Sequence, residues 1–108
     1  MTAPFFDSSA PPVLQSDLVE LAATYRIQGD PLLRLTHRAT RGGGFGDPAA
    51  RPYAWAAWVM VDGQWRQVIS ARGLPREWTS LDRAEAWLHG LGFYRFSVER
   101  PAPEPPAA

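Results

Sequence analysis

Two β-prone stretches flank the dipeptide Asp62-Gly63, and this arrangement constrains the fold more than any other part of the chain. Residues 53–61 read YAWAAWVMV and residues 64–70 read QWRQVIS, so both stretches are rich in aromatic and β-branched residues, which favour strands. Asp-Gly is a preferred pair for a two-residue type I′ turn, because both central positions of that turn need a positive φ. The sequence therefore predicts a β-hairpin. Its cross-strand pairs are Met60 with Trp65, Val59 with Arg66, and Trp58 with Gln67.

The hairpin register also divides the side chains between the two faces of the predicted sheet, since successive residues of a strand point to opposite sides. One face carries Trp58, Met60, Trp65 and Ile69. The other face carries Trp55, Val59, Val61, Arg66, Val68 and Ser70. We expect helices to cover the first face, although the second face is not cleanly polar.

The region before the hairpin predicts one helix and one further strand. A helix is expected over residues 11–29, with Gly29 as its natural end. Its apolar positions at helical spacing are Leu14, Leu18, Leu21 and Tyr25. Residues 32–38, LLRLTHR, alternate between apolar and polar, and this pattern is typical of a half-buried strand. Leu33, Leu35 and His37 share the presumed inward face.

The region after the hairpin predicts a second helix and a last strand. Within residues 79–92, Thr79 and Asp82 resemble a capping box, and Gly90 or Gly92 ends the helix. The apolar stripe of this helix is Leu81, Ala84, Leu88 and Leu91. Residues 93–99 form the last strand. The element order α-β-β-β-α-β indicates an α+β fold, in which an antiparallel sheet of about four strands has two helices packed on one face.

The 108 residues are enough for one domain with one hydrophobic core. We expect this domain to span residues 12–100, between a flexible N-terminal tail (1–11) and a disordered Pro/Ala-rich tail (101–108). The chain contains no cysteine and no apolar run long enough for a membrane span, so a cytoplasmic protein without disulfides is expected.

The charge is balanced overall but unevenly distributed. Eleven basic residues, all of them arginine, match eleven acidic residues, and this balance argues against a strongly cationic nucleic-acid binder. From Pro31 to Arg76, however, seven arginines face only two acids, Asp47 and Asp62. Such clustering can create a local positive face on a neutral protein.

The stretch GFGDPA, residues 44–49, fits the letters of a dinucleotide-binding fingerprint. That fingerprint must lead from a strand into a helix whose N-terminus faces the pyrophosphate. Here Pro52 and a Trp-rich strand follow instead, and a P-loop is excluded because the chain has no lysine. We therefore interpret the stretch as an inter-strand loop, and no cofactor is expected.

Catalytic groups are equally sparse. His37 and His89 are the only histidines, and without cysteines or acids at ligand spacing they do not predict a metal site. His89 near a helix C-terminus suits the helix dipole, and His37 is expected to be a hydrogen-bonded core residue. The chain is therefore predicted not to be an enzyme.

Arginine and tryptophan interleaved on a sheet suit base stacking and phosphate contact. We expect a nucleic-acid site built on the Arg-rich sheet edge and the glycine-rich loop. Its candidate residues are Arg38, Arg41, Arg51, Trp55, Arg66, Arg72 and Arg76.

Residues 53–88 resemble the β-β-β-α DNA-binding modules at the N-termini of phage-type tyrosine integrases, which are similar to plant AP2-type domains. The matching residues are Gly63, Trp65, Arg66, Arg72, Arg76, Ala84, Trp87 and Leu88. The resemblance implies a sheet that enters the major groove, with Arg66, Arg72 and Trp55 at DNA. The additional first helix and a sheet poorer in cations depart from that pattern. The whole chain also resembles small accessory proteins of plasmids and integrative elements, including partition-associated ones.

Two functions therefore remain open. The first is a non-enzymatic, nucleic-acid-associated accessory protein of a mobile genetic element. The second is a protein-interaction module, for example an inhibitor or adaptor that blocks a host protein complex, as a monomer or a homodimer. The arrangement of the central arginines separates the two, because a DNA-binding surface needs them on one contiguous face rather than in internal pairs.

Overall fold

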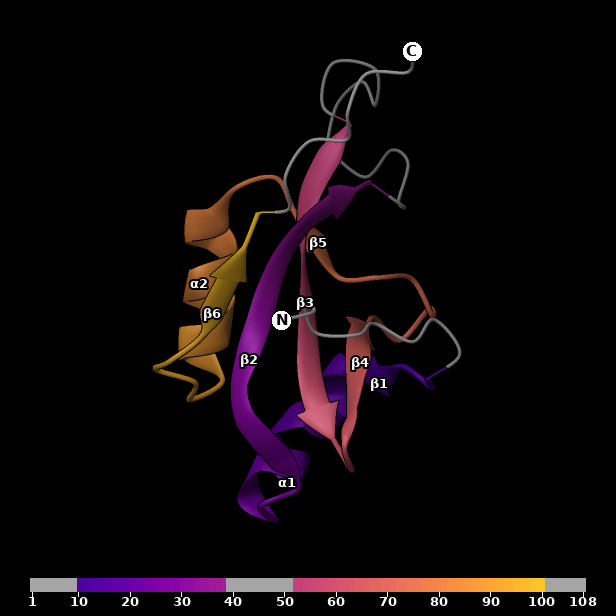
Figure 1. The fold of residues 1–108 in the computed structure, drawn as a ribbon, viewed down its shortest axis with the longest axis vertical. Helices are drawn as coiled ribbons and strands as arrows, with labels where there is room; N and C mark the ends of the chain where they lie inside the picture. The colour runs from indigo at the N-terminus through magenta and orange to yellow at the C-terminus, as the bar shows by residue number, and fades with distance from the viewer. Residues whose placement is uncertain (1–9, 39–51, 101–108) are drawn as a thin grey trace, which may run out of the picture.

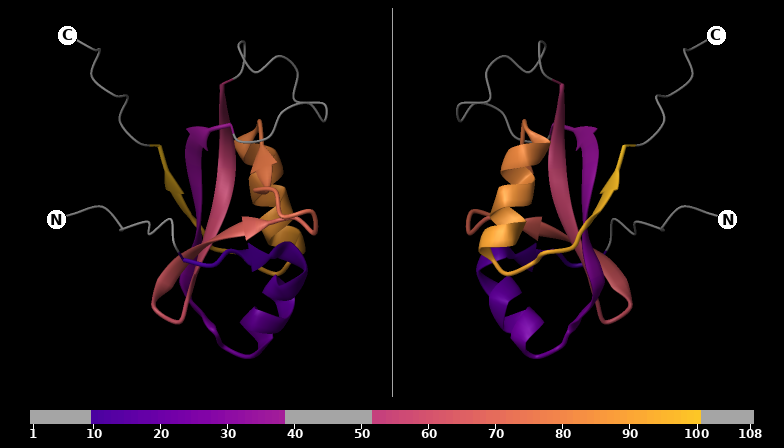
Figure 2. Two further views of the ribbon diagram at one scale, coloured as in Figure 1. Left: turned by 90° about the vertical axis from the view of Figure 1, so that its right-hand side faces the viewer. Right: turned by 90° about the vertical axis from the view of Figure 1, so that its left-hand side faces the viewer.

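The computed structural model describes residues 10–38 and 52–100, and the described residues form an α+β fold, as predicted (Figure 1). Its elements are β1 (Val13–Leu14), a 3₁₀ turn (Gln15–Asp17), α1 (Leu18–Ala23), β2 (Ile27–His37), β3 (Tyr53–Val61), β4 (Gln64–Ile69), β5 (Glu77–Trp78), α2 (Leu81–Gly90) and β6 (Ser97–Glu99). Both helices lie on the same side of the sheet (Figure 2). The predicted tails and the loop at 39–51 fall largely outside the described residues.

The sheet is mixed, with the strand order β1-β4-β3-β2-β6 and β5 beside β3. Strands β2, β3 and β4 form an antiparallel meander, whereas β1 runs parallel to β4 and β6 runs parallel to β2. The prediction of about four antiparallel strands is thus only partly right. Strands β1 and β5 have two residues each and leave no periodic pattern in the sequence. The chain returns to the far edge through α2, which brings β6 alongside β2 in the same direction.

The predicted hairpin is confirmed. Asp62 and Gly63 have φ values of 52° and 79°, as a type I′ turn requires. The three predicted cross-strand pairs of β3 and β4 are all present. Local turn chemistry therefore sets the register of the two central strands.

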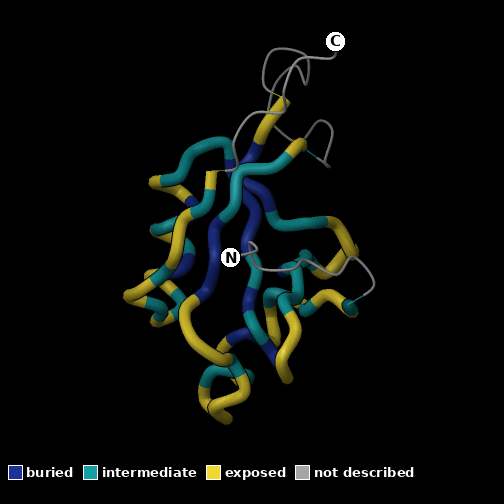
Figure 3. Tube along the Cα trace, in the orientation of Figure 1, coloured by how far each residue is buried: buried dark blue, intermediate teal, exposed yellow. Residues whose placement is uncertain are grey.

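The expected covering of the two sheet faces is wrong. The hydrophobic core contains Val59, Val61 and Val68, packed with Leu18 of α1 and Leu88 of α2. The helices therefore cover the valine face, and the central stretches of β2 and β3 are largely buried (Figure 3). Arg66 also lies on this face, where it is partly buried and donates hydrogen bonds to the Val61 and Pro11 carbonyls.

The first predicted helix is much shorter than expected. Strand β1 and the 3₁₀ turn precede α1, which ends at Ala23. Tyr25 lies beyond the helix with φ of 59° and is 92% exposed, so it does not belong to an apolar stripe. Gly29, expected as the helix end, lies within β2 at φ of 67°, where the pairing with β3 shifts register between Gln28 and Leu32.

The second helix is confirmed, with corrections at both of its ends. Ser80 is the N-cap residue and its side chain makes no capping hydrogen bond, so the predicted Thr79–Asp82 capping box is wrong. At the other end Gly92 has φ of 97°, and the Phe93 N–H donates to the Leu88 carbonyl over 3.0 Å. The last strand spans three residues rather than seven. Neither helix in the described part of the chain is long and apolar enough to cross a membrane.

Candidate functional site

The described residues among those predicted to contact nucleic acid lie in different parts of the structure. Arg41, Arg51 and the glycine-rich stretch at 44–49 lie outside the described residues. Trp55 is only 5% exposed and belongs to the hydrophobic core. Arg38 follows β2, and its backbone N–H donates to the Pro52 carbonyl over 2.8 Å.

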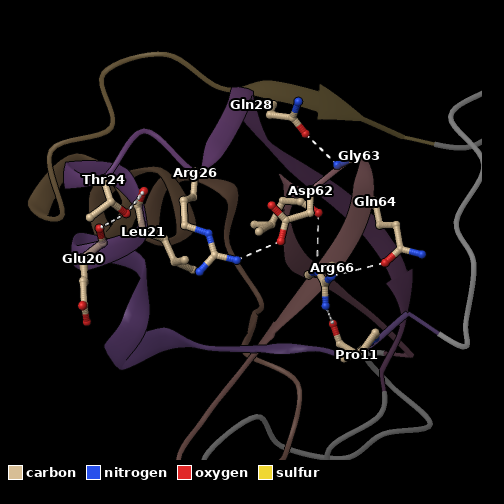
Figure 4. A network of polar contacts seen from close by, with 11 residues as sticks. Pro11, Glu20, Leu21, Thr24, Arg26, Gln28, Asp62, Gly63, Gln64 and Arg66 are labelled. Atoms are coloured by element: carbon tan, nitrogen blue, oxygen red, sulfur yellow. Dashed lines mark hydrogen bonds and ion pairs between the residues drawn. The ribbon is translucent and has the colours of Figure 1, made fainter.

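Arg66 is engaged within the protein. Its Nε donates to the Val61 carbonyl (3.4 Å), its Nη1 to the Pro11 carbonyl (3.2 Å) and its Nη2 to the Gln64 side chain (3.3 Å). These bonds tie the segment before β1 to the hairpin (Figure 4). The side chain therefore holds two parts of the fold together, and each of its three guanidinium nitrogens already donates to an acceptor within the protein.

Two further arginines form ion pairs. Arg26 Nη2 lies 2.8 Å from Asp62 Oδ2 in an exposed pair between the end of α1 and the hairpin turn. Arg34 Nε lies 2.7 Å from Glu99 Oε1 and links β2 to β6. The Nε–H of Arg34 makes no aligned hydrogen bond, so this contact is an ion pair only. Of these two, only Arg34 is one of the central arginines between Pro31 and Arg76.

A different arrangement surrounds Arg76. Its guanidinium carbon lies 4.8 Å from the ring centroid of Trp78 and 5.8 Å from that of Trp87. The two indole rings are themselves 4.8 Å apart and tilted by 44°. We refer to Arg76, Trp78 and Trp87 as the Arg–Trp cluster. Among the described residues Arg76 has no acidic partner, and its buried Nε has no hydrogen-bond acceptor.

The chain builds this cluster from three elements. The Arg76 N–H donates to the Val68 carbonyl over 3.0 Å, which fixes the approach to β5. Arg76 and Trp78 are two residues apart in an extended segment, so their side chains point to the same side. Trp87 comes from the flank of α2 that lies next to β5. The spacing of Arg76 and Trp78 is visible in the sequence, whereas the approach of Trp87 depends on tertiary packing.

Arg72, also a predicted site residue, lies in the exposed turn before this segment. The turn is closed by Gly73, whose φ is 80° and whose N–H donates to the Ser70 carbonyl over 2.9 Å. Arg72 and Arg76 are therefore the two described candidates that the structure places in one connected segment.

The side of the sheet opposite the helices carries a second group of large side chains. We call this surface the helix-free face and define it by Leu14, Trp58, Met60, Trp65 and Ile69. None of these residues belongs to the hydrophobic core of the described chain, and all remain partly or fully exposed. Leu32, Ala54 and Ala56 on the same face are buried.

A hollow of about 650 Å³ lies between α1 and the hairpin turn (Figure 4). Asp17, Glu20 and Asp62 line it together with Arg26 and Arg66, so both signs of charge are present. The described residues contain no group of three or more His, Cys, Asp or Glu that could hold a metal ion.

The two histidines each contact a tyrosine ring. His37 is exposed rather than part of the core, and its ring centroid lies 4.8 Å from that of Tyr53. This corrects the expected inward position of His37, which lies where β2 leaves the helix-covered region. The ring of His89 meets Tyr94 edge-on at 4.8 Å.

The comparisons add no relative: no protein-family model, curated protein or solved structure matches this chain. The resemblance to integrase-type DNA-binding modules stays a prediction.

Proposed function

We propose that this protein is a non-enzymatic protein-interaction module that self-associates through its helix-free face. The proposal is carried by one observation: Leu14, Met60 and Ile69 are partly or fully exposed on the side of the sheet opposite the described helices. Met60 and Ile69 are partly exposed and Leu14 is 39% exposed, whereas Val59, Val61 and Val68 on the opposite face are buried in the core.

The composition of this face suits a protein partner. Tryptophan and methionine are enriched at the centre of protein interfaces, and the helix-free face brings Trp58, Met60 and Trp65 together on neighbouring strands. The charges on this face include the Arg34–Glu99 ion pair and the buried Glu77. A surface with these carboxylates is poorly suited to a phosphate backbone.

The geometry of the sheet favours a second copy of the chain as the occupant. Two sheets pack face to face most readily when their twists match, and an identical sheet meets this condition. Two-fold symmetric dimers are also the commonest assemblies of soluble proteins. Addition of a strand at the sheet edges is less favourable, because β1 and β6 are only two and three residues long.

Sedimentation equilibrium of the full chain over a range of protein concentrations tests the proposal. The wild-type protein is expected to form a dimer. The variant Met60→Glu is expected to weaken dimerisation by at least about 100-fold, because each copy then buries an unpaired carboxylate in the interface.

Val19→Glu is the matched control, since Val19 is 55% exposed on α1, on the other side of the sheet. This variant is expected to dimerise normally, and circular dichroism verifies that both variants are folded. A wild-type chain that stays monomeric throughout, or dimerisation that Val19→Glu disrupts and Met60→Glu does not, contradicts the proposal.

A further inference from the structure

The Arg–Trp cluster holds a positive charge to which the described residues provide no counter-ion. Arg76 lies against two indole rings at 4.8 and 5.8 Å, while Arg26 and Arg34 of the same chain have carboxylate partners. Contact with the rings restricts the guanidinium to one orientation and removes part of its water shell. A guanidinium in this state is prepared to bind an oxyanion, because little further ordering is needed.

The hydrogen-bonding state of Arg76 supports the same conclusion. Its Nε is buried and donates to no acceptor, which is uncommon for a buried polar atom. The described residues also provide no acceptor for its two terminal nitrogens. An oxygen-rich anion bound at the terminal nitrogens supplies acceptors that the described residues do not.

The surroundings of the cluster are basic. Arg83 lies one helical turn before Trp87 and therefore on the same flank of α2. Glu85 lies one turn before His89, on the opposite flank, where His89 meets Tyr94. Glu77 alternates with Arg76 and Trp78 and lies on the other face of the sheet, opposite Ala56. Glu77 and Glu85 thus point away from the cluster.

We propose that the Arg–Trp cluster binds single-stranded nucleic acid, with a backbone phosphate at Arg76 and a base against the exposed part of Trp87. A partly exposed indole beside a guanidinium is the combination by which proteins hold single strands, since every base offers a flat ring for stacking. Arg72, in the exposed turn four residues earlier, and Arg83 are placed to meet neighbouring phosphates. An acidic peptide would use the arginines but would leave the indole without a matching group.

This site lies on the helix-covered side of the sheet and is separate from the helix-free face. The site and self-association can therefore fail independently of each other.

The test is fluorescence anisotropy of a labelled 15-nucleotide oligo-dT titrated with the full chain at about 20 and 200 mM NaCl. Binding is expected to saturate and to weaken about 125-fold over this range, as three phosphate contacts on a single strand require. Arg76→Ala is expected to weaken binding by at least about tenfold. Arg76→Lys, which keeps the charge but not the planar fork, is expected to fall between this variant and the wild type.

Arg26→Ala is the matched control, because Arg26 is an exposed arginine already paired with Asp62. This variant is expected to bind like the wild type. In ¹⁵N-resolved spectra the Arg76 Nε–H signal is expected to shift when oligo-dT is added, a change that a purely structural role of Arg76 would not produce.

Three results would overturn the proposal. They are no oligo-dT binding at low salt, equal weakening by Arg26→Ala and Arg76→Ala, and Arg76-dependent binding of a labelled oligo-glutamate peptide at least as tight as that of oligo-dT.

Discussion

Tyr25 has a positive φ, a backbone conformation that glycine adopts with less strain. It lies just after α1 with φ of 59°, and the helix ends there because the Arg26 N–H donates to the Leu21 carbonyl over 2.9 Å. The Tyr25 N–H donates to the Ala22 carbonyl over 3.1 Å, which completes a Schellman motif. Glycine is the usual residue at this position because a side chain disfavours positive φ. The ring contributes little packing in return, since Tyr25 is 92% exposed.

Tyr25→Gly is therefore expected to increase the free energy of unfolding by about 0.5–1 kcal/mol, measured by urea denaturation. The gain reflects relief of backbone strain, reduced by the extra freedom of glycine in the unfolded chain. Tyr25→Ala removes the same ring without this conformational freedom and is expected to change stability by less. Equal stability of the two variants contradicts this account.

The environment of individual arginines could be predicted from the sequence only in part. The alternation of β4 places Arg66 correctly on the valine face, but its three neutral acceptors come from residues as distant as Pro11. Arg76 was predicted as a site residue, whereas its contact with Trp87 depends on how α2 packs against β5. Side-chain partners across long sequence separations leave no local pattern.

At the scale of secondary structure, the hairpin turn is held by its own backbone and by β2. The Gly63 N–H donates to the Gln28 side-chain oxygen over 2.7 Å, and Asp62 pairs with Arg26. A Cβ added at Gly63 would meet no atom within 4 Å, so a substitution there acts through the positive φ and not through a clash.

Gly63→Val is accordingly expected to destabilise the protein by about 2 kcal/mol, because a β-branched residue strongly disfavours φ of 79°. Gly90→Ala provides a control that is expected to change the stability in the opposite direction. Gly90 lies in α2 with no heavy atom near its virtual Cβ, so the alanine is expected to stabilise by about 0.5–1 kcal/mol. Thermal unfolding followed by circular dichroism measures both changes. An unaltered midpoint in Gly63→Val would show that the turn is not type I′.

The elements that could be predicted are those whose determinants are local. The hairpin depends on two adjacent residues, and α2 on the spacing of Ala84 and Leu88, so both appear in the sequence. The choice of sheet face could not be predicted in this way, because both faces of β3 and β4 are apolar. Val59 and Val61 lie beneath the helices together with the buried Trp55, while Trp58 and Trp65 are on the other side.

At the scale of the whole molecule, the two sides of the sheet differ: one carries a charge without a described counter-ion, and the other carries exposed apolar side chains. The helix-covered side contains the core, and at its margin lies a guanidinium without a counter-ion. The helix-free side leaves apolar area exposed. A domain normally buries each apolar sheet face against another layer, and the described residues supply a helical layer on one side only.

If a second copy provides the missing layer, the stability of the molecule must depend on its concentration. For a folded dimer that unfolds to two monomers, mass action adds about 2.7 kcal/mol of stability per dimer for each 100-fold rise in concentration. For chains of this size we expect the unfolding midpoint to rise by about 5–10 °C between about 5 and 500 μM. In Met60→Glu the midpoint is expected to be independent of concentration, as scanning calorimetry would show. A wild-type midpoint that stays constant over the same range would mean that the helix-free face is not covered by a second copy.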